Sequence, residues 1–574
     1  MAARRILRRR LITAPERLPA GLPPVLQRVY AARAIECAAD LDYALDKLLP
    51  PDRLGGLEQA VGLLSEALEA GWRIVVVGDF DADGATSCAL CLRALRSMGA
   101  TDVHYLVPNR FEYGYGLTPE IVAVAATMRP DLIVTVDNGI SSLAGVAAAR
   151  ERGIRVLITD HHLPGAALPP ADAIVNPSLH GEGFPGRNLA GVGVAFYVLL
   201  ALRAGLRARG WFTRQGLPEP NLGKFLDLVA LGTVADVVPL DRNNRILVQQ
   251  GLQRIRAGRC APGIRALLEA AGRTPGRAVA ADLGFVVGPR LNAAGRLEDM
   301  SLGIECLLTD SAADARAMAA RLDTLNRDRK DIEAGMQAQA LAAIEALGLD
   351  TQELPAGLCL FDPQWHQGVI GILAARIKER FHRPVIAFAR GGKGELKGSA
   401  RSVAGLHIRD ALEAVATRHP ELISRFGGHA MAAGLTLTEE QLPAFVAAFA
   451  AEASRLLSEE DRQGVIYTDG PLADEEFSLT TAKLLRDAGP WGQGFPAPQF
   501  DGNFEILEQR VVGERHLKMF LRPIDGSRRI EGIAFGTGSL PATCRVARLV
   551  YRLDVNEYRS VERAQLAIEH IEHG

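Results

Sequence analysis

Short apolar runs alternate with helix-forming stretches between residues 57 and 177, and this alternation limits the folds open to the chain. The runs lie at 72–77, 131–136, 155–159 and 173–175. They are rich in Val and Ile, and stretches such as 85–98 between them have helical composition. Strands that are apolar along their whole length are buried on both faces, which is typical of a parallel sheet covered by helices. The pattern therefore predicts an α/β domain, with helices taking over from 189 to 271.

The chain is too long for a single domain. At roughly 150 residues per domain, 574 residues correspond to three or four domains. Residues 310–347 are nearly all helix formers with apolar side chains at helical spacing, which predicts one long connecting helix. The last segment has short alternating runs and turn residues, which is typical of a small β-barrel. We predict a basic segment at 1–50, a parallel-sheet domain at 51–308, a connecting helix at 309–348, a smaller α/β domain at 349–456 and the barrel at 464–574.

Charge, cysteine content and the apolar runs bear on the cellular compartment in which the protein works. The net charge of −2 does not point to any class of binding partner, although the first 33 residues hold eight arginines and one glutamate. The seven cysteines are scattered and odd in number, which favours a reducing compartment over a disulfide framework. The longest apolar run, 189–202, is 14 residues long, whereas a bilayer span needs ~20. We expect a buried core helix there and a cytoplasmic protein.

Acidic residues follow three of the predicted strands directly. The first strand runs into Asp79, Asp81 and Asp83, the next into Asp137, and the third into Asp160, His161 and His162. Open α/β sheets place their ligand crevice at the carboxyl ends of the strands. A single Asp-rich turn is weak support for function, because Asp is common in turns and helix caps. Three successive strand ends are much harder to explain in that way.

Such a cluster has the chemistry of a metal centre. Close carboxylates repel one another unless a cation neutralises them. Oxygen ligands with one or two imidazoles suit Mg²⁺ or Mn²⁺ better than zinc. Two ions about 4 Å apart could grip a phosphate and activate a water molecule. A further acid, Asp236, lies in a stretch of small and apolar residues, and Asp227, nine residues earlier, could serve in its place.

These motifs resemble a known set. GDFDADG (78–84), VTVDNG (134–139), TDHH (159–162) and GTVADVVPL (232–240) are similar, in this order, to the four motifs of the DHH phosphoesterase superfamily. RFGGHAMAAG (425–434) resembles the DHHA1 domain that accompanies it. Further similar stretches lie at 288–296, 365–371 and 398–402. Over essentially the whole chain, the resemblance is to the bacterial single-strand-specific 5′→3′ exonucleases of this superfamily, and it implies a DHH domain, a DHHA1 domain and a C-terminal OB-fold.

The resemblance implies the roles of individual residues. It makes the following residues ligands of a two-ion Mn²⁺ or Mg²⁺ site: Asp79, Asp81, Asp83, Asp137, His161 and Asp236. Asp160 would not bind the metal itself but would fix the orientation of the His161 imidazole. His162 would contact the scissile phosphate or protonate the leaving oxygen. The implied activity is hydrolysis of single-stranded DNA to 5′-mononucleotides in DNA repair and recombination.

Residues for binding the 5′ end are expected in Gly-, Asn- and Ser-containing segments. The candidates are Arg110, Arg290, Asn292, Arg296, Ser399, Arg401, Gly427, Gly428 and His429. We expect the four arginines to lie in loops, where their planar guanidinium groups can grip phosphates. In the barrel domain, basic residues from Arg510 to Arg529 interleave with Phe504, Phe520 and Phe535, a mixture that OB-folds use on single strands.

Three alternatives remain at this point. The first keeps the chemistry but acts on cyclic dinucleotides, pyrophosphate or very short oligonucleotides, and salt-sensitive binding of long DNA would discriminate against it. The second is a scaffold that has lost catalysis, which the full set of ligands argues against. The third, a transporter, is disfavoured by the short apolar run. The resemblance also implies a single-strand-binding protein and a RecQ-type helicase as partners, no membrane, and a monomer.

Overall fold

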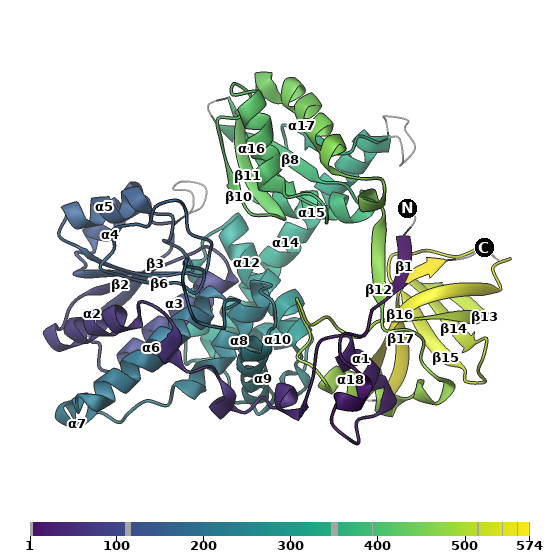
Figure 1. Cartoon of the computed structure of the whole chain (residues 1–574), viewed down its shortest axis with the longest axis horizontal. Helices are drawn as coiled ribbons and strands as arrows, with labels where there is room; N and C mark the ends of the chain where they lie inside the picture. Colours follow the sequence, from purple (N-terminus) through teal and green to yellow (C-terminus); the bar gives the residue numbers. More distant parts are fainter. Residues whose placement is uncertain are drawn as a thin grey trace. The chain divides into compact units, whose positions relative to one another are not determined.

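The computed structural model describes residues 4–108, 116–345, 354–392, 394–513, 516–541, 543–558 and 561–572. The chain forms two compact units. Unit 1 consists of Met1–Leu7 and Asn326–Tyr467, and unit 2 consists of Arg8–Leu325 and Thr468–Gly574. The division falls inside a single long helix, α14 (Ala312–Glu345), which confirms the predicted connecting helix (Figure 1).

Unit 2 contains the predicted parallel sheet. Its strands are β2 (Ile74–Gly78), β3 (Val103–Leu106), β4 (Leu132–Val136), β5 (Arg155–Thr159) and β6 (Ala173–Val175). Their order is β3-β2-β4-β5-β6, and every neighbouring pair is parallel. Four of the five strands were predicted. The edge strand β3 was not predicted, because its Val-His-Tyr-Leu sequence is half exposed and lacks an apolar run.

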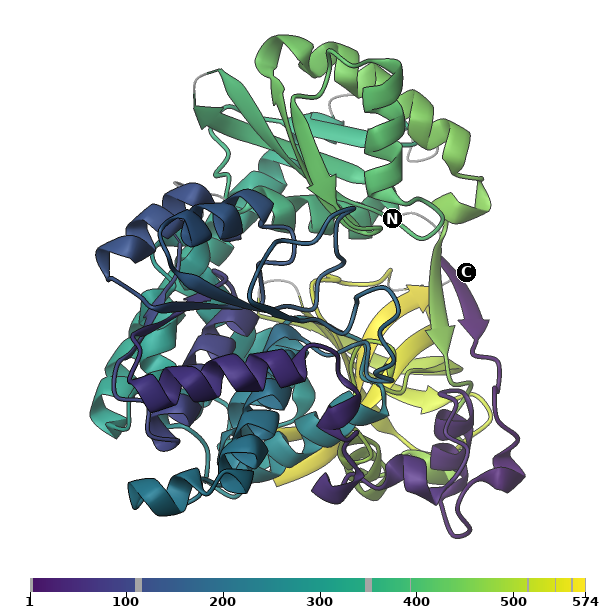
Figure 2. The ribbon, with the colours of Figure 1, turned by 60° about the vertical axis from the view of Figure 1, so that its left-hand side comes forward.

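Helices cover both faces of the sheet (Figures 1 and 2). The helical elements of this part are α1 (Pro24–Ala31), α2 (Leu57–Ala70), α3 (Ala82–Ser97), α4 (Pro119–Thr127), α5 (Leu143–Glu151), α6 (Gly191–Ala208), α7 (Trp211–Gln215), α8 (Leu226–Ala235), α9 (Arg242–Arg256), α10 (Pro262–Ala270), α11 (Ala280–Asp282), the π-helical turn η7 (Leu283–Val287), α12 (Gly288–Leu297) and α13 (Ser301–Leu308). Val75 and Val77 of β2 pack with α4 and α5, whereas Ile74 and Val76 join the core that includes α2, α3 and α6. This alternation is the period of a strand that is buried on both faces.

Helix α6 settles the meaning of the longest apolar run. Among the described residues it is the one helix that is long and apolar enough to cross a membrane by composition. Most of its side chains, including Phe196, Tyr197 and Leu202, are buried in unit 2. The expected core helix is therefore confirmed.

The remaining part of unit 2 is a closed barrel. Its strands are β13 (Phe500–Val512), β14 (His516–Pro523), β15 (Ile530–Ala534), β16 (Val546–Tyr558) and β17 (Val561–Glu572), and α18 (Leu479–Asp487) precedes them. The order is β13-β14-β15-β17-β16, with β15 and β17 parallel. The barrel and the helices share one apolar core. The basic N-terminal segment is tied to the barrel domain through Arg33, which donates to both carboxylate oxygens of the buried Asp469 at 2.8 and 3.0 Å.

Unit 1 is a smaller α/β fold. Its strands are β7 (Leu358–Phe361), β8 (Val385–Gly392), β9 (Glu395–Arg401), β10 (Arg425–Gly428) and β11 (Ala432–Thr438), and its helices are α15 (Ile370–Phe381), α16 (Ile408–Arg418) and α17 (Leu442–Leu456). The sheet order is β10-β11-β9-β8-β7, and only β7 and β8 are parallel. A separate pair, β1 (Arg4–Arg8) and β12 (Gly464–Thr468), forms a two-stranded sheet.

Candidate metal centre

The strand ends of unit 2 bring the predicted acids together. Three groups of side chains have ligand atoms within 4.8 Å of one another: Asp79, Asp81 and Asp137; Asp83, His161 and Asp236; and Asp137, His161 and His162. Asp137 belongs to two of the groups. All six residues expected to be ligands therefore lie in one cluster at the carboxyl ends of β2, β4 and β5, together with the end of α8.

Helix starts hold two of the carboxylates in place. Asp81 caps α3, and its Oδ1 accepts hydrogen bonds from the backbone N–H groups of Asp83 and Gly84, both at 3.0 Å. Asp83 is buried and accepts from the first N–H groups of α6, at 2.7 Å from Gly191 and 3.0 Å from Val192. The unpaired N–H groups of a helix start favour negative charge. Two helices therefore fix these side chains before any cation binds.

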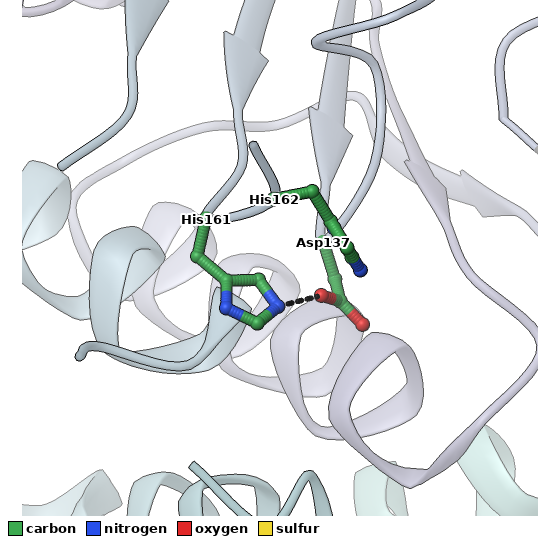
Figure 3. A group of neighbouring side chains, drawn as sticks. All are labelled: Asp137, His161 and His162. Atoms are coloured by element: carbon green, nitrogen blue, oxygen red, sulfur yellow. Dashed lines mark ion pairs between the residues drawn. The ribbon is translucent and has the colours of Figure 1, made fainter. Parts of the chain in front are cut away.

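Asp137 and His161 point toward each other from neighbouring strands (Figure 3). The Nε2 atom of His161 lies 3.1 Å from Oδ1 of Asp137 and 3.5 Å from Oδ2 of Asp236. Asp137 has a left-handed backbone, with φ of 62°, which is uncommon outside glycine and is often found at functional sites. Asp236 and Asp227 were the two candidates for the last ligand, and the structure places Asp236 in the cluster. The carboxylate of Asp227 instead accepts a hydrogen bond from the backbone N–H of Ala261 at 2.6 Å.

The cluster is electrostatically crowded without a cation. Burial, together with the charge of Asp81, raises the pKa of Asp83 to about 7. Burial and the neighbouring carboxylates also raise the pKa values of Asp137 and Asp236 well above the usual range for Asp. Divalent cations with a preference for oxygen ligands would remove this repulsion. The donor set of carboxylates and one imidazole fits Mn²⁺ or Mg²⁺.

This crowding of carboxylates predicts that the free energy of unfolding in EDTA has an unusual dependence on pH. A buried Asp with a raised pKa keeps its proton when the unfolded chain, with an Asp pKa of about 3.9, has lost it. The free energy of unfolding should therefore fall as the pH rises from about 4 through 7. Guanidinium unfolding at pH 5 and pH 8 measures the effect, and saturating Mn²⁺ should remove this contribution. The same pH slope with EDTA and with Mn²⁺ would contradict the assignment.

Asp160 organises the second histidine. Its Oδ1 lies 2.8 Å from Nδ1 of His162 and accepts from the backbone N–H groups of His161 and His162, while its Oδ2 accepts from Ile140 at 2.9 Å. Burial by itself would raise the pKa of Asp160, but the hydrogen bond from His162 holds this pKa below its usual value. Burial by itself would lower the pKa of His162, but the hydrogen bond to Asp160 and the charge of that carboxylate raise it above its usual value. The expectation that Asp160 orients the ring of His161 is therefore corrected: the ring it contacts is that of His162.

Two residues that hold the histidine segment in place were not predicted from the sequence. Asn176 donates to the backbone carbonyl of His162, and Ser178 donates to that of His161, both at 2.9 Å. They follow β6, the fourth predicted strand. The rule that polar residues at strand ends form the site would have found them if it had been applied to this strand as well.

Helix α12 packs against the metal-binding loop. Arg290, Asn292 and Arg296 lie on this helix, so the expectation that these arginines lie in loops was wrong. Arg290 pairs with Asp323 at 2.7 Å, and Oδ1 of Asn292 accepts from the backbone N–H of Ala82 at 2.7 Å. A side chain at Gly295 would lie within 2.0 Å of the carbonyl oxygen of Phe80, so glycine permits this close approach. The Gly-rich sequence reflects helix packing rather than a loop.

Asn292→Ala should loosen the loop that carries the first three acids. Losing one hydrogen bond of about 1 kcal/mol should raise the Mn²⁺ concentration for half-maximal activity roughly fivefold. The measurement is a Mn²⁺ titration of initial rates at saturating DNA. If Asn292 bound substrate directly, as we expected from the resemblance, the KM for DNA would rise instead and the Mn²⁺ dependence would not change.

The remaining predicted substrate residues have different outcomes. Arg110 lies outside the described residues. In unit 1, Ser399 pairs with Gly434 on β11, which in turn pairs with Gly427 on β10, so three neighbouring strands bring these residues together. The guanidinium of Arg401 donates to Oγ of Ser399 at 3.2 Å from strand β9 rather than from a loop. Gly428 and His429 continue β10 at the same end of the sheet.

The aromatic pattern of the barrel was partly misread. Phe504 is buried inside the barrel, where it packs edge-on against Phe477 and Tyr551, so it cannot stack on bases. Phe520 lies beneath Arg529, whose guanidinium carbon is 4.2 Å from the ring centre. Phe535 is 66% exposed. Several of the basic residues pair with neighbouring glutamates, as Lys518 does with Glu531 at 2.9 Å, and Arg515 lies outside the described residues.

Comparisons with known proteins agree with this geometry. Residues 73–233 match the DHH family N-terminal domain, 354–455 the DHHA1 domain and 468–570 the RecJ OB domain. The chain is 58% identical to the single-stranded-DNA-specific exonuclease RecJ of Dickeya dadantii and 55% identical to that of Escherichia coli, over 98% of each chain in both cases. The crystal structure of RecJ from Thermus thermophilus in complex with Mn²⁺ matches 99% of this chain and 79% of its own, with 33% identity and a TM-score of 0.81.

Proposed function

Because the chain belongs to the RecJ family of single-stranded-DNA-specific exonucleases, we propose that its metal centre cleaves single-stranded DNA from the 5′ end and releases 5′-mononucleotides. The protein is a hydrolase of the DHH superfamily and uses Mn²⁺ or Mg²⁺. The observation that carries the proposal is the meeting of six ligand side chains at the carboxyl ends of three parallel strands and the end of α8. A role in DNA repair and recombination accords with this activity.

Two groups of side chains would each hold one cation. Asp79, Asp81 and Asp137 form one set, and Asp83, His161 and Asp236 form the other. The carboxylate of Asp137 also lies 3.1 Å from Nε2 of His161, a member of the second set, so Asp137 would help to hold both cations. When bound, the two cations neutralise the charge of the scissile phosphate and lower the pKa of water.

His162 is suited to deliver the proton that the leaving group requires. Its Nδ1 is bonded to Asp160, so Nε2 is the ring atom that can face a substrate. Release of a 5′-mononucleotide breaks the bond between phosphorus and the 3′ oxygen of the terminal nucleotide. The imidazolium donates its proton to that oxygen, and Asp160 stabilises the charged ring.

The terminal phosphate needs cationic anchors. We propose Arg290 and Arg296, both on α12, for this role, together with Arg110. Within unit 1, taken by itself, we assign Ser399, Arg401, Gly427, Gly428 and His429 to a separate anion cradle. Burial lowers the pKa of Arg401, and a phosphate would supply the countercharge.

The domain division and the cellular setting complete the proposal. The three family matches lie within the proposed domains 51–308, 349–456 and 464–574. A cytoplasmic monomer that acts with a single-strand-binding protein and a RecQ-type helicase is consistent with a substrate that must first be unwound.

A time course on single-stranded DNA labelled at either end tests the proposal. We expect mononucleotides from the 5′ end with Mn²⁺ or Mg²⁺, none in EDTA, and an intact blunt duplex. Release from the 3′ end would contradict the polarity. Cleavage of dinucleotides alone would favour a small-substrate phosphodiesterase, and tight binding without cleavage would favour a scaffold.

A further inference from the structure

A cavity of about 430 Å³ lies in unit 2 between the helices of the DHH domain and the barrel domain. Its walls are mainly apolar and include Val234, Val237 and Phe285 on one domain and Trp491 on the segment that leads into the barrel. The backbone N–H of Leu240 donates to the carbonyl of Gln493 at 2.7 Å, which fixes the two walls together. A cavity of this size and composition is typical of a small-ligand site.

The cavity begins next to the metal centre. Val237 directly follows Asp236, is 62% exposed and has a left-handed backbone with φ of 64°. This conformation is a genuine outlier for a β-branched residue, and such strain is concentrated at functional sites. The backbone turns at Val237, so that the residue directly after the proposed metal ligand Asp236 lines the cavity.

Phe285 supplies an aromatic surface at the same place. It lies on the π-helical turn η7, immediately before α12, and is 83% exposed. Apolar side chains of this size are costly to leave in water without a partner, and π-helical turns occur frequently at functional sites. Gly284, the preceding residue, packs closely on Val234, so the turn is held against α8 while the ring of Phe285 remains free of the core.

Polar side chains also line the cavity. Gln249 offers both a donor and an acceptor, and Arg256 donates through Nε to the carbonyl of Ala278 at 2.8 Å. Arg486 and Asp487 also line the cavity and pair with each other at 3.0 Å. Apolar walls with a few polar groups suit a flat, partly polar ligand and disfavour a bare phosphate.

We propose that this cavity is a nucleobase subsite, in which Phe285 stacks on a base of the substrate strand located 3′ of the scissile phosphate. The inference rests on the proposed function, because in cleavage from the 5′ end the uncut strand continues on the 3′ side. The cavity lies between the metal ligand Asp236 and the barrel, where that strand would pass. Stacking on an aromatic ring tolerates any base, as an exonuclease requires.

Single abasic positions in an oligonucleotide test the proposal. Binding to the full-length protein is measured in Ca²⁺, with an abasic residue at each position from the second to the eighth nucleotide. For the wild-type protein we expect one position at which the abasic residue weakens binding about five- to tenfold. Phe285→Ala should weaken binding of the intact strand by the same factor and should remove the effect of that position. Phe285→Tyr should restore it.

Leu143→Ala is the matched control, because Leu143 is an exposed apolar residue on α5 outside the cavity and should leave every affinity unchanged. If Phe285→Ala keeps the same positional profile as the wild type, the subsite is wrong and the cavity suits an apolar segment of another protein. That result would leave 5′ cleavage of DNA with Mn²⁺ intact, so failure of this inference is distinguishable from failure of the proposed function.

Discussion

Asp137→Asn should reduce exonuclease turnover by at least a factor of about 10³ while leaving the affinity for single-stranded DNA within about twofold. Asp137 belongs to the group of Asp79 and Asp81, and its Oδ1 also lies 3.1 Å from Nε2 of His161, a member of the second proposed set, so its loss should affect both cation positions. Charge stabilisation by bound cations is worth several kcal/mol in the transition state, and each 1.36 kcal/mol corresponds to a tenfold change in rate. Phosphate contacts elsewhere dominate binding and remain in place. Single-turnover cleavage and a binding titration in Ca²⁺ measure the two quantities.

The same variant should be more stable than the wild type in EDTA. It removes one carboxylate from a buried group whose pKa values are raised by mutual repulsion. The melting temperature in EDTA should therefore rise, and the increase on adding Mn²⁺ should shrink. Asp131→Asn is the matched control, because Asp131 lies one residue before β4, at the amino ends of the strands of the same sheet, and is exposed. A folded Asp137→Asn protein with wild-type turnover would overturn the metal assignment.

The metal centre was largely predictable because strand ends in a parallel sheet meet in space. Asp79, Asp137 and His161 are far apart along the chain, but each follows a run of Val and Ile that could only be a buried strand. Once the sheet is assumed, their proximity follows without any knowledge of the side-chain directions. Choosing Asp236 over Asp227 needed coordinates, because both acids lie at ends of the same helix, α8.

The direction of side chains was not predictable from the sequence. The partner of Asp160 depends on which way two adjacent imidazole rings turn, and the ring of His162 is the one that turns toward it. Phe504 and Phe520 both lie on barrel strands, but only the register shows that the first points inward. The strands β9 (ELKGSAR) and β10 (RFGG) were not predicted, because neither sequence has the apolar pattern of a strand.

His162→Gln should lower kcat about 10²- to 10⁴-fold, which is the range for loss of a general acid. Glutamine can still donate a hydrogen bond to the phosphate, but it cannot transfer a proton to the departing 3′ oxygen. The KM for DNA and the Mn²⁺ concentration for half-maximal activity should change by less than about twofold, because the proposed cation ligands and phosphate anchors are intact. His180→Gln, at an exposed position outside the cluster, is the control.

A substrate with a sulfur atom in place of the scissile 3′ oxygen separates general acid catalysis from a structural role. A thiolate leaves without protonation, so His162→Gln should cleave this substrate at nearly the wild-type rate. Asp160→Asn should behave in the same way, because it acts on the leaving group only through the charge and orientation of His162. If the sulfur substrate were cleaved as poorly as ordinary DNA by both variants, His162 would instead act by positioning the phosphate, and the role of Asp160 would be to hold the histidine segment.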